Sequence, residues 1–199
     1  THTMVYVELD DGYMVLDVTD SFHPAGFLEI NSLNKSGWVV DEENPRWVDI
    51  PAQKSVQKYL IQAELDNNGK LKGNIRGSFR GYAAIRNRKE LQDEKGIGWK
   101  DDLLDRYLEA EVKPLEVKNE HNIYKPLRVS MDCELSKAAT TNEEFIYLSP
   151  VIIESYTENP FKLEKRNYPV DIPYPVSEDY ILNLTIPQDY NIEELPESV

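Results

Sequence analysis

The residue types that could do chemistry are few, and two of them lie near the start of the chain. His2 precedes an alternating apolar segment at 3–9, and Asp17 follows fifteen residues later in a second such segment, 13–19. A carboxylate that accepts a hydrogen bond from one imidazole nitrogen fixes the tautomer and leaves the other nitrogen free to take a proton. A histidine and an aspartate held together in this way could take part in acid–base chemistry, so we treat His2 and Asp17 as candidate site residues.

The turn between the two segments decides whether these side chains meet. Asp10-Asp11-Gly12 is typical of a β-hairpin. A tight turn at Asp11-Gly12 would place His2 on the face of Asp17 but about 13 Å away along the strand. A turn near Leu9-Asp10, or a bulge, would pair them directly. The alternative is a solvated histidine beside an aspartate on a polar strand face, and the sequence leaves the register open.

A thiol nucleophile is the natural partner of such a pair, and the chain has a single cysteine, Cys133. It shares one face of an alternating segment with Val129, Met131 and Leu135. This pattern predicts a half-buried strand with Cys133 on its core side, and not a reactive thiol. We therefore expect the chain to be inactive on its own, for lack of a nucleophilic cysteine.

Metal and cofactor sites have little support in the sequence. The three histidines, His2, His23 and His121, are far apart, and neither H-x-x-x-H nor C-x-x-C occurs. Gly96-Ile97-Gly98 is an isolated pair of glycines, without the Gly-Lys-Ser/Thr of a phosphate-binding loop. We predict no metal site and no cofactor.

Charge narrows the range of partners. The formal net charge is −14, from 36 acidic and 22 basic residues. Such a surface repels phosphate backbones and acidic lipid surfaces, so we do not expect nucleic acid as a partner. Apolar runs are strand-sized and fall well short of the ~20 residues that a membrane-spanning helix needs.

The elements that must position these residues are mainly strands. A long hairpin is predicted from segments 55–65 and 70–80 around a turn at 66–69, and helical patterns follow at 81–93 and 99–111. Further strand candidates lie at 112–118, 127–136, 144–148, 151–156, 167–172 and 179–187. We predict a mainly β (α+β) fold, a β-sandwich or barrel with a short helical insert.

The segment from His2 to Leu16-Asp17-Val18-Thr19 resembles the transglutaminase-like superfamily of papain-type thiol enzymes. In that family a histidine precedes an apolar strand, and a turn with an aromatic residue leads to a Leu-Asp-x-Thr ending. The resemblance implies that His2 activates a catalytic cysteine and that Asp17 orients the imidazole. The family's cysteine lies upstream of its histidine.

A second resemblance covers the later part of the chain. It rests on Asn159-Pro160-Phe161-Lys162, on 166–171, on 180–187 and on Glu194-Leu195-Pro196, with Gly81-Tyr82-Ala83-Ala84 and Arg88 also fitting. These residues are similar to the C-terminal β-domain of uncharacterised proteins common in Bacteroidetes-type bacteria, which place a transglutaminase-like core before it. The resemblance implies that 1–51 is the end of such a core and that 52–199 is the C-terminal β-domain, truncated at its end.

Taken together, the resemblances imply a fragment of a larger cysteine protease, amidase or acyl transferase. They imply a peptide or cell-wall-like substrate, a cell-envelope or periplasmic location, and the upstream thiol-domain segment of the same protein as partner.

A different hypothesis is a non-catalytic β-sandwich module that binds carbohydrate or protein. The 12 tyrosines and 3 tryptophans could line a binding groove, or they could fill the core. Solvent exposure of Trp38, Trp47 and Trp99 discriminates between these two roles.

Overall fold

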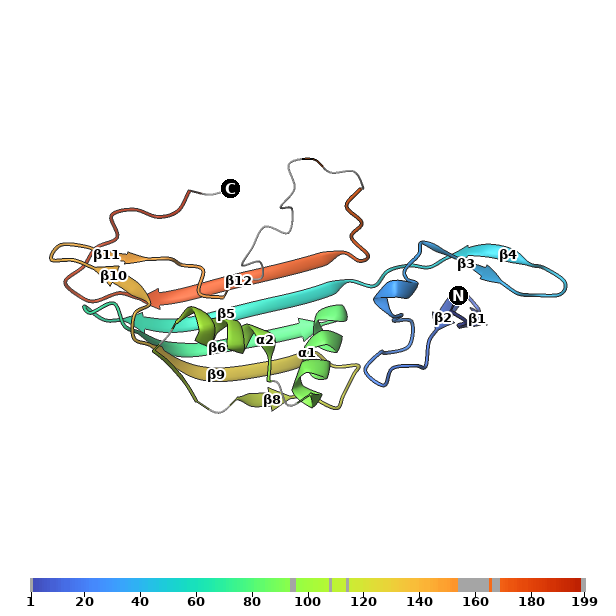
Figure 1. Cartoon of the computed structure of the whole chain (residues 1–199), viewed down its shortest axis with the longest axis horizontal. Helices are drawn as coiled ribbons and strands as arrows, with labels where there is room; N and C mark the ends of the chain where they lie inside the picture. The colour runs from blue at the N-terminus through green and yellow to red at the C-terminus, as the bar shows by residue number, and fades with distance from the viewer. Residues whose placement is uncertain are drawn as a thin grey trace.

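The structure is a computed structural model that describes residues 2–93, 96–107, 109–113, 115–153, 165 and 169–197. A long twisted sheet dominates it, and a smaller N-terminal part lies at one end of this sheet (Figure 1). The mainly β fold with a short helical insert is confirmed. No helix among the described residues has the length and apolar character needed to cross a membrane.

The N-terminal part consists of two antiparallel hairpins. Its elements are β1 (Val5–Leu9), β2 (Gly12–Leu16), the short 3₁₀ helix η1 (Ile30–Ser32), β3 (Ser36–Val39) and β4 (Arg46–Asp49). The Tyr13 hydroxyl donates a hydrogen bond of 2.7 Å to the Asp49 carbonyl, and Arg46 Nη2 donates one of 2.7 Å to Glu8. These two contacts hold the hairpins against each other.

The central sheet has six strands, in the order β12-β5-β6-β9-β7, with β8 also pairing with β9. Their bounds are β5 (Ser55–Leu65), β6 (Leu71–Arg80), β7 (Ala110–Val112), β8 (Glu116–Lys118), β9 (Leu127–Leu135) and β12 (Val176–Thr185). All neighbours are antiparallel except β12, which runs parallel to β5. The predicted hairpin of β5 and β6 is confirmed. In its turn, Asp66 Oδ1 accepts hydrogen bonds from the backbone amides of Asn68 and Lys70.

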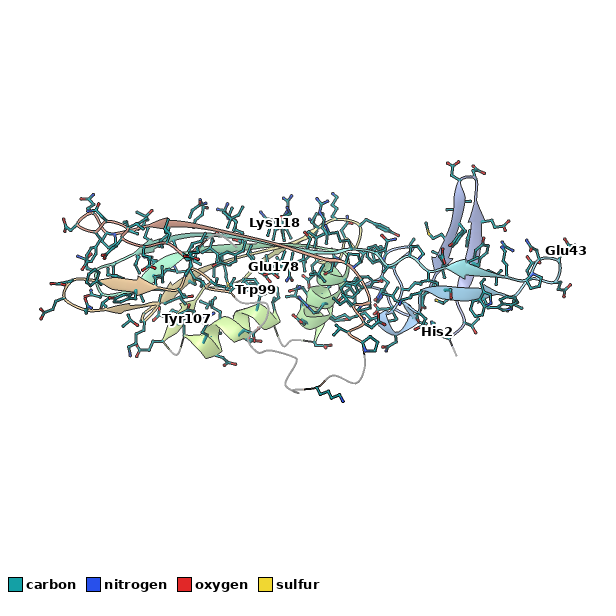
Figure 2. The ribbon with its side chains drawn as sticks, turned by 90° about the horizontal axis from the view of Figure 1, so that it is seen from above. His2, Glu43, Trp99, Tyr107, Lys118 and Glu178 are labelled. Carbon is teal, nitrogen blue, oxygen red and sulfur yellow. The ribbon has the colours of Figure 1, made fainter. Side chains whose placement is uncertain are left out.

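Strict alternation along the strands gives the sheet one buried and one exposed face. The helices α1 (Tyr82–Gln92) and α2 (Gly98–Arg106) cover the buried face, together with the segment that carries β10 (Ala139–Thr141) and β11 (Ile146–Leu148). In Figure 2, Trp99 lies on the helix side of the sheet and Lys118 on the other. The layer over the sheet is thus largely helical among the described residues, where the sequence predicted a second sheet or a closed barrel.

Arg88 in α1 is the largest fully buried side chain of the described structure, with 1% of its surface exposed. Its Nε donates to the carbonyl of Glu120, and its Nη2 donates to the carbonyls of Asn119, Asn122 and Lys125. Burial lowers the pKa of the Arg88 guanidinium, but these four carbonyl dipoles compensate for the lost hydration. Arg88 therefore fixes the loop between β8 and β9 against α1.

Two of the strand predictions are wrong where the structure describes them. Residues 151–153 and 169–172 are not in strands, while 154–156 and 167–168 lie outside the described residues. The Tyr180 hydroxyl bonds to the Pro150 carbonyl and the Ile152 amide, and the Ile152 side chain is 1% exposed. The apolar run at 151–153 thus fills the core without joining a ladder.

Candidate functional site

The structure brings the two predicted catalytic residues into direct contact. His2 Nε2 lies 2.7 Å from Asp17 Oδ2. The Asp17 side chain is 5% exposed, whereas the His2 side chain is 43% exposed. The carboxylate is therefore shielded while the imidazole faces solvent at the open end of the β1–β2 hairpin, where Figure 2 labels His2.

The hairpin register explains how the contact arises. The turn is Asp10-Asp11, because Leu9 pairs with Gly12. Continued beyond the ladder, this register sets His2 opposite Thr19, so that His2 and Asp17 are diagonal neighbours on one face. Diagonal cross-strand neighbours lie roughly 7–8 Å apart at the backbone, within reach of a histidine side chain. The sequence suggested a turn at Asp11-Gly12 or near Leu9-Asp10, and the observed turn at Asp10-Asp11 lies between them.

The second oxygen of Asp17 is anchored by Thr19. Asp17 Oδ1 accepts hydrogen bonds from the Thr19 backbone amide, at 3.0 Å, and from Thr19 Oγ1, at 2.7 Å. Burial opposes ionisation of Asp17, but the hydrogen bonds from Thr19 and His2 outweigh it and lower the pKa of this carboxyl. The resemblance assigns no role to Thr19, although its position two residues after Asp17 is typical of a side chain that bonds to the aspartate.

An ionised Asp17 sets the tautomer of His2. A carboxylate only accepts hydrogen bonds, so the proton of the neutral imidazole must lie on Nε2. Nδ1 is then the basic nitrogen, and the described residues offer it no hydrogen bond. The arrangement presents an oriented, accessible base.

Cys133 is not part of this arrangement. It lies in β9 of the central sheet with 3% exposure, as its alternation predicts. Burial, helped by the charge of Asp132, raises the pKa of the Cys133 thiol to about 11. A protonated, buried thiol is a poor nucleophile, so Cys133 is a core residue.

A second cluster of ionisable groups lies in the loop after β2, where Asp20, His23 and Glu29 gather with ligand atoms within 4.8 Å of one another. Lys89 of α1 bonds to Asp20 and lies 3.2 Å from Glu29 Oε1. Its ammonium supplies the positive charge that a metal ion would bring, so we interpret the cluster as an ion-pair network. Burial opposes the ionisation of Asp20, but hydrogen bonds from Lys89 and from the Phe22 amide, together with the charges of Lys89 and His23, outweigh it and lower the pKa of Asp20.

The sequence prediction missed this cluster because it compared histidines only with one another. The signal in the sequence is that Asp20 lies three residues before His23 and Glu29 lies six residues after it. Its structural role is clear: it ties the loop after β2 to α1.

The tryptophans divide into two groups. Trp38 and Trp47 are a cross-strand pair on β3 and β4, with ring centroids 5.4 Å apart and planes at 63°. They are 50% and 67% exposed, whereas Trp99 is 7% exposed and packs in the core. Two of the three tryptophans thus lie on the surface, a distribution that the sequence left open.

Comparison with known protein families relates the end of the chain to an uncharacterised domain. A family model named DUF3858, described as a domain of unknown function with a solved structure, matches residues 144–199. The end of this chain is similar to that uncharacterised domain. No curated protein and no solved structure matches the chain. The match overlaps the later resemblance found in the sequence, although Asn159-Pro160-Phe161-Lys162 lie outside the described residues.

The DUF3858 segment does not stand apart from the rest of the fold. Its β12 pairs with β5 along ten consecutive residues, from Val176 opposite Ser55 to Thr185 opposite Glu64. Its β11 pairs with β10, which precedes the matched residues. The segment therefore completes a sheet that earlier residues begin.

Proposed function

We propose that His2 and Asp17 are the base and the orienting acid of a transglutaminase-like thiol enzyme, a protease, amidase or acyl transferase that acts on peptide-like bonds. The observation that carries this proposal is the 2.7 Å hydrogen bond from the accessible His2 to an Asp17 that Thr19 anchors. The resemblance of this segment to the transglutaminase-like superfamily supports it, and it names the missing group as a cysteine.

The chemistry follows from the tautomer. His2 Nδ1 would take the proton of a cysteine thiol, and the thiolate would attack the carbonyl carbon of the substrate. The imidazolium, stabilised by the Asp17 carboxylate, would then give its proton to the leaving amine. Water or a second amine would release the acyl group. Because Cys133 is buried, the nucleophile would come from outside these 199 residues.

The test needs a gene product that contains this chain together with the proposed thiol segment. We expect His2→Ala to lower kcat/KM for amide hydrolysis or transfer by at least ~100-fold, the contribution of a positioned base. Asp17→Asn should lower it as well and should abolish the Nε2–H tautomer, which ¹⁵N NMR of the imidazole reports.

His121→Ala is the matched control, because His121 is an exposed histidine in the loop before β9. It should retain the wild-type kcat/KM. Full activity of His2→Ala would refute the proposal.

A second candidate function is binding, and the exposure of Trp38 and Trp47 favours it. We propose that this pair is a contact surface for a protein or carbohydrate ligand. Acrylamide should quench the fluorescence of Trp38 and Trp47 readily and that of Trp99 poorly. Uniform protection of all three would remove the support for this candidate.

A further inference from the structure

The β3–β4 hairpin has one face against the molecule and one face in solvent. Val39 is 9% exposed, and a side chain at Gly37 would meet Ile50 at 3.2 Å. The alternate positions point outward and bring Trp38 and Trp47 directly opposite each other. The outward face is therefore a small two-stranded platform of paired indoles.

The platform is strongly acidic. The tip carries Asp41, Glu42 and Glu43, and Asp49 lies on the outward face two residues after Trp47. Backbone amides of Glu43 and Asn44 bond to Asp41 Oδ1 and lower the pKa of Asp41. Four carboxylates thus lie on the hairpin that carries the two indoles, three in its tip and one on the outward face of β4, and Figure 2 shows Glu43 at the far end of the molecule.

The guanidinium of Arg46 lies on the other side of this hairpin from the indoles. Arg46 alternates with Trp47 along β4, and its guanidinium bonds to Glu8 and to the Tyr6 hydroxyl of the β1–β2 hairpin. Its charge also helps to lower the pKa of Asp41, so Arg46 offsets part of the acidity of the tip. The four carboxylates of the hairpin still outnumber this one guanidinium.

We infer that this platform binds an extended cationic peptide segment through its lysine or arginine side chains. Trp38 and Trp47 pack edge to face and remain half exposed or more, and a cation over an indole face is stabilised by the ring quadrupole. Asp49 lies one strand repeat from Trp47, roughly 7 Å away, so that alternate peptide side chains reach the ring and the carboxylate. This inference rests on the proposed binding function and is independent of the His2–Asp17 pair.

Charge complementarity separates this ligand from a neutral sugar. Carbohydrate rings also stack on exposed indoles and can donate hydrogen bonds to carboxylates, but an uncharged sugar gains no net Coulomb attraction from four carboxylates. A cationic peptide is attracted both by the platform and by the net charge of −14 of the whole chain.

The experiment is fluorescence anisotropy of a labelled short peptide of alternating lysine and threonine, titrated with the full chain at low and moderate salt. We expect saturable binding that weakens with salt. Trp47→Ala should raise the Kd roughly two- to fivefold, the effect of losing one exposed cation–π contact. Asp49→Asn should raise the Kd and flatten the salt dependence, and Trp47→Phe should retain most of the affinity.

Tyr147→Ala is the matched control, because Tyr147 is 60% exposed on the separate β10–β11 hairpin. It should leave the Kd unchanged, and near-UV circular dichroism should show that every variant is folded. Equal binding of a glutamate–threonine peptide, or an equal loss in Tyr147→Ala, would overturn the inference. Binding of a neutral oligosaccharide in place of the cationic peptide would overturn it but preserve the binding function. Binding of neither ligand would overturn both.

Discussion

Asp17 differs from an ordinary surface aspartate because both of its oxygens are used. One oxygen accepts from His2 and the other accepts twice from Thr19. An aspartate held in this way keeps its charge and its direction while the exposed imidazole is free to exchange protons with a partner. The residue that makes the His2 geometry dependable is therefore Thr19.

The first prediction concerns the acid titration of Asp17. Its pKa in the folded chain lies below the usual value near 3.8, so this group stabilises the fold above about pH 4. The contribution is lost as the pH falls through the lowered pKa. Thr19→Val should raise the pKa of Asp17 and lower the free energy of unfolding at pH 7 by about 1–2 kcal/mol. Carboxyl ¹³C NMR and urea unfolding measure both effects.

The loss of stability in Thr19→Val should shrink when unfolding is repeated below the folded pKa of Asp17, where the carboxyl is protonated. An unchanged pKa of Asp17 in this variant would show that Thr19 does not hold the carboxylate.

The candidate site was predictable in its residue types but not in its geometry. His2 and Asp17 could be paired from the spacing, whereas their contact depends on the turn at Asp10-Asp11, one residue away from either alternative. Exposure of Trp38 and Trp47 could not be read from the sequence, since indoles fill cores and cover surfaces alike. The sequence determines which side chains alternate, and tertiary packing decides which side is buried.

At the scale of elements, α1 begins at a backbone position that only glycine suits. Gly81 has φ of +60°, and a Cβ there would lie 1.9 Å from the Lys54 carbonyl oxygen. The close approach joins the end of β6 to the chain just before β5. The direction in which α1 starts across the sheet is therefore set by the missing side chain of Gly81.

The second prediction follows from this junction. Gly81→Ala should lower the free energy of unfolding by at least ~2 kcal/mol, because the backbone strain and the contact with Lys54 add together. Gly98→Ala is the control, since a Cβ at the start of α2 would lie 3.5 Å from Glu90 Oε2, an ordinary contact. It should be neutral or stabilise by up to ~1 kcal/mol. Chemical denaturation measures the free energy of unfolding of both variants. Equal values for Gly81→Ala and Gly98→Ala would contradict the role of Gly81.

The third prediction concerns the buried guanidinium. Arg88→Met should cost about 3–5 kcal/mol of stability, because buried carbonyls lose their donor. Amide exchange in the loop at 119–126 should accelerate more than elsewhere. Arg86→Met is the control on the same helix, with a side chain 60% exposed, and it should change stability by less than about 0.5 kcal/mol. If the loop at 119–126 keeps its protection from amide exchange in Arg88→Met, Arg88 does not fix this loop against α1.

Local elements were predicted well where the sequence pattern was local. The β5–β6 hairpin follows from alternation around Asp66–Gly69, and the second helix follows from its apolar stripe. The prediction of this helix ran too far, since α2 ends at Arg106 and residues 110–111 lie in β7. The parallel pairing of β12 with β5 joins segments more than a hundred residues apart, and no local pattern encodes it. The run at 151–153 has a strand-like composition, but it joins no strand. The Tyr180 hydroxyl instead donates a hydrogen bond to the Pro150 carbonyl and accepts one from the Ile152 amide.

At the scale of the whole molecule, the N-terminal part and the sheet have different sources of stability. The main core cluster of the described residues draws on strands and helices from Tyr59 onward and on no residue before it. The N-terminal part is attached through the Lys89 network and through the Tyr82 hydroxyl, which donates to the Leu28 carbonyl. The domain boundary near residue 51 stays a prediction, and it can be tested with fragments.

The fourth prediction tests that boundary. A fragment of residues 52–199 should unfold cooperatively and give a dispersed amide NMR spectrum, because it holds all six sheet strands. Residues 144–199, the part that matches DUF3858, should not fold alone, since β12 and β11 lose their partners. A dispersed amide NMR spectrum of the shorter fragment would contradict this, as would an unfolded longer fragment.

The parallel pairing of β12 has a consequence during synthesis. The ribosome delivers β5 and β6 long before the last strand, so the side of β5 that β12 will cover waits while residues 66–175 are translated. An unsatisfied row of amides and carbonyls next to apolar side chains invites pairing with other nascent chains. For this protein the hazard of misassembly is greatest before residue 176 emerges, and a slow decoding step upstream of it would prolong that exposure.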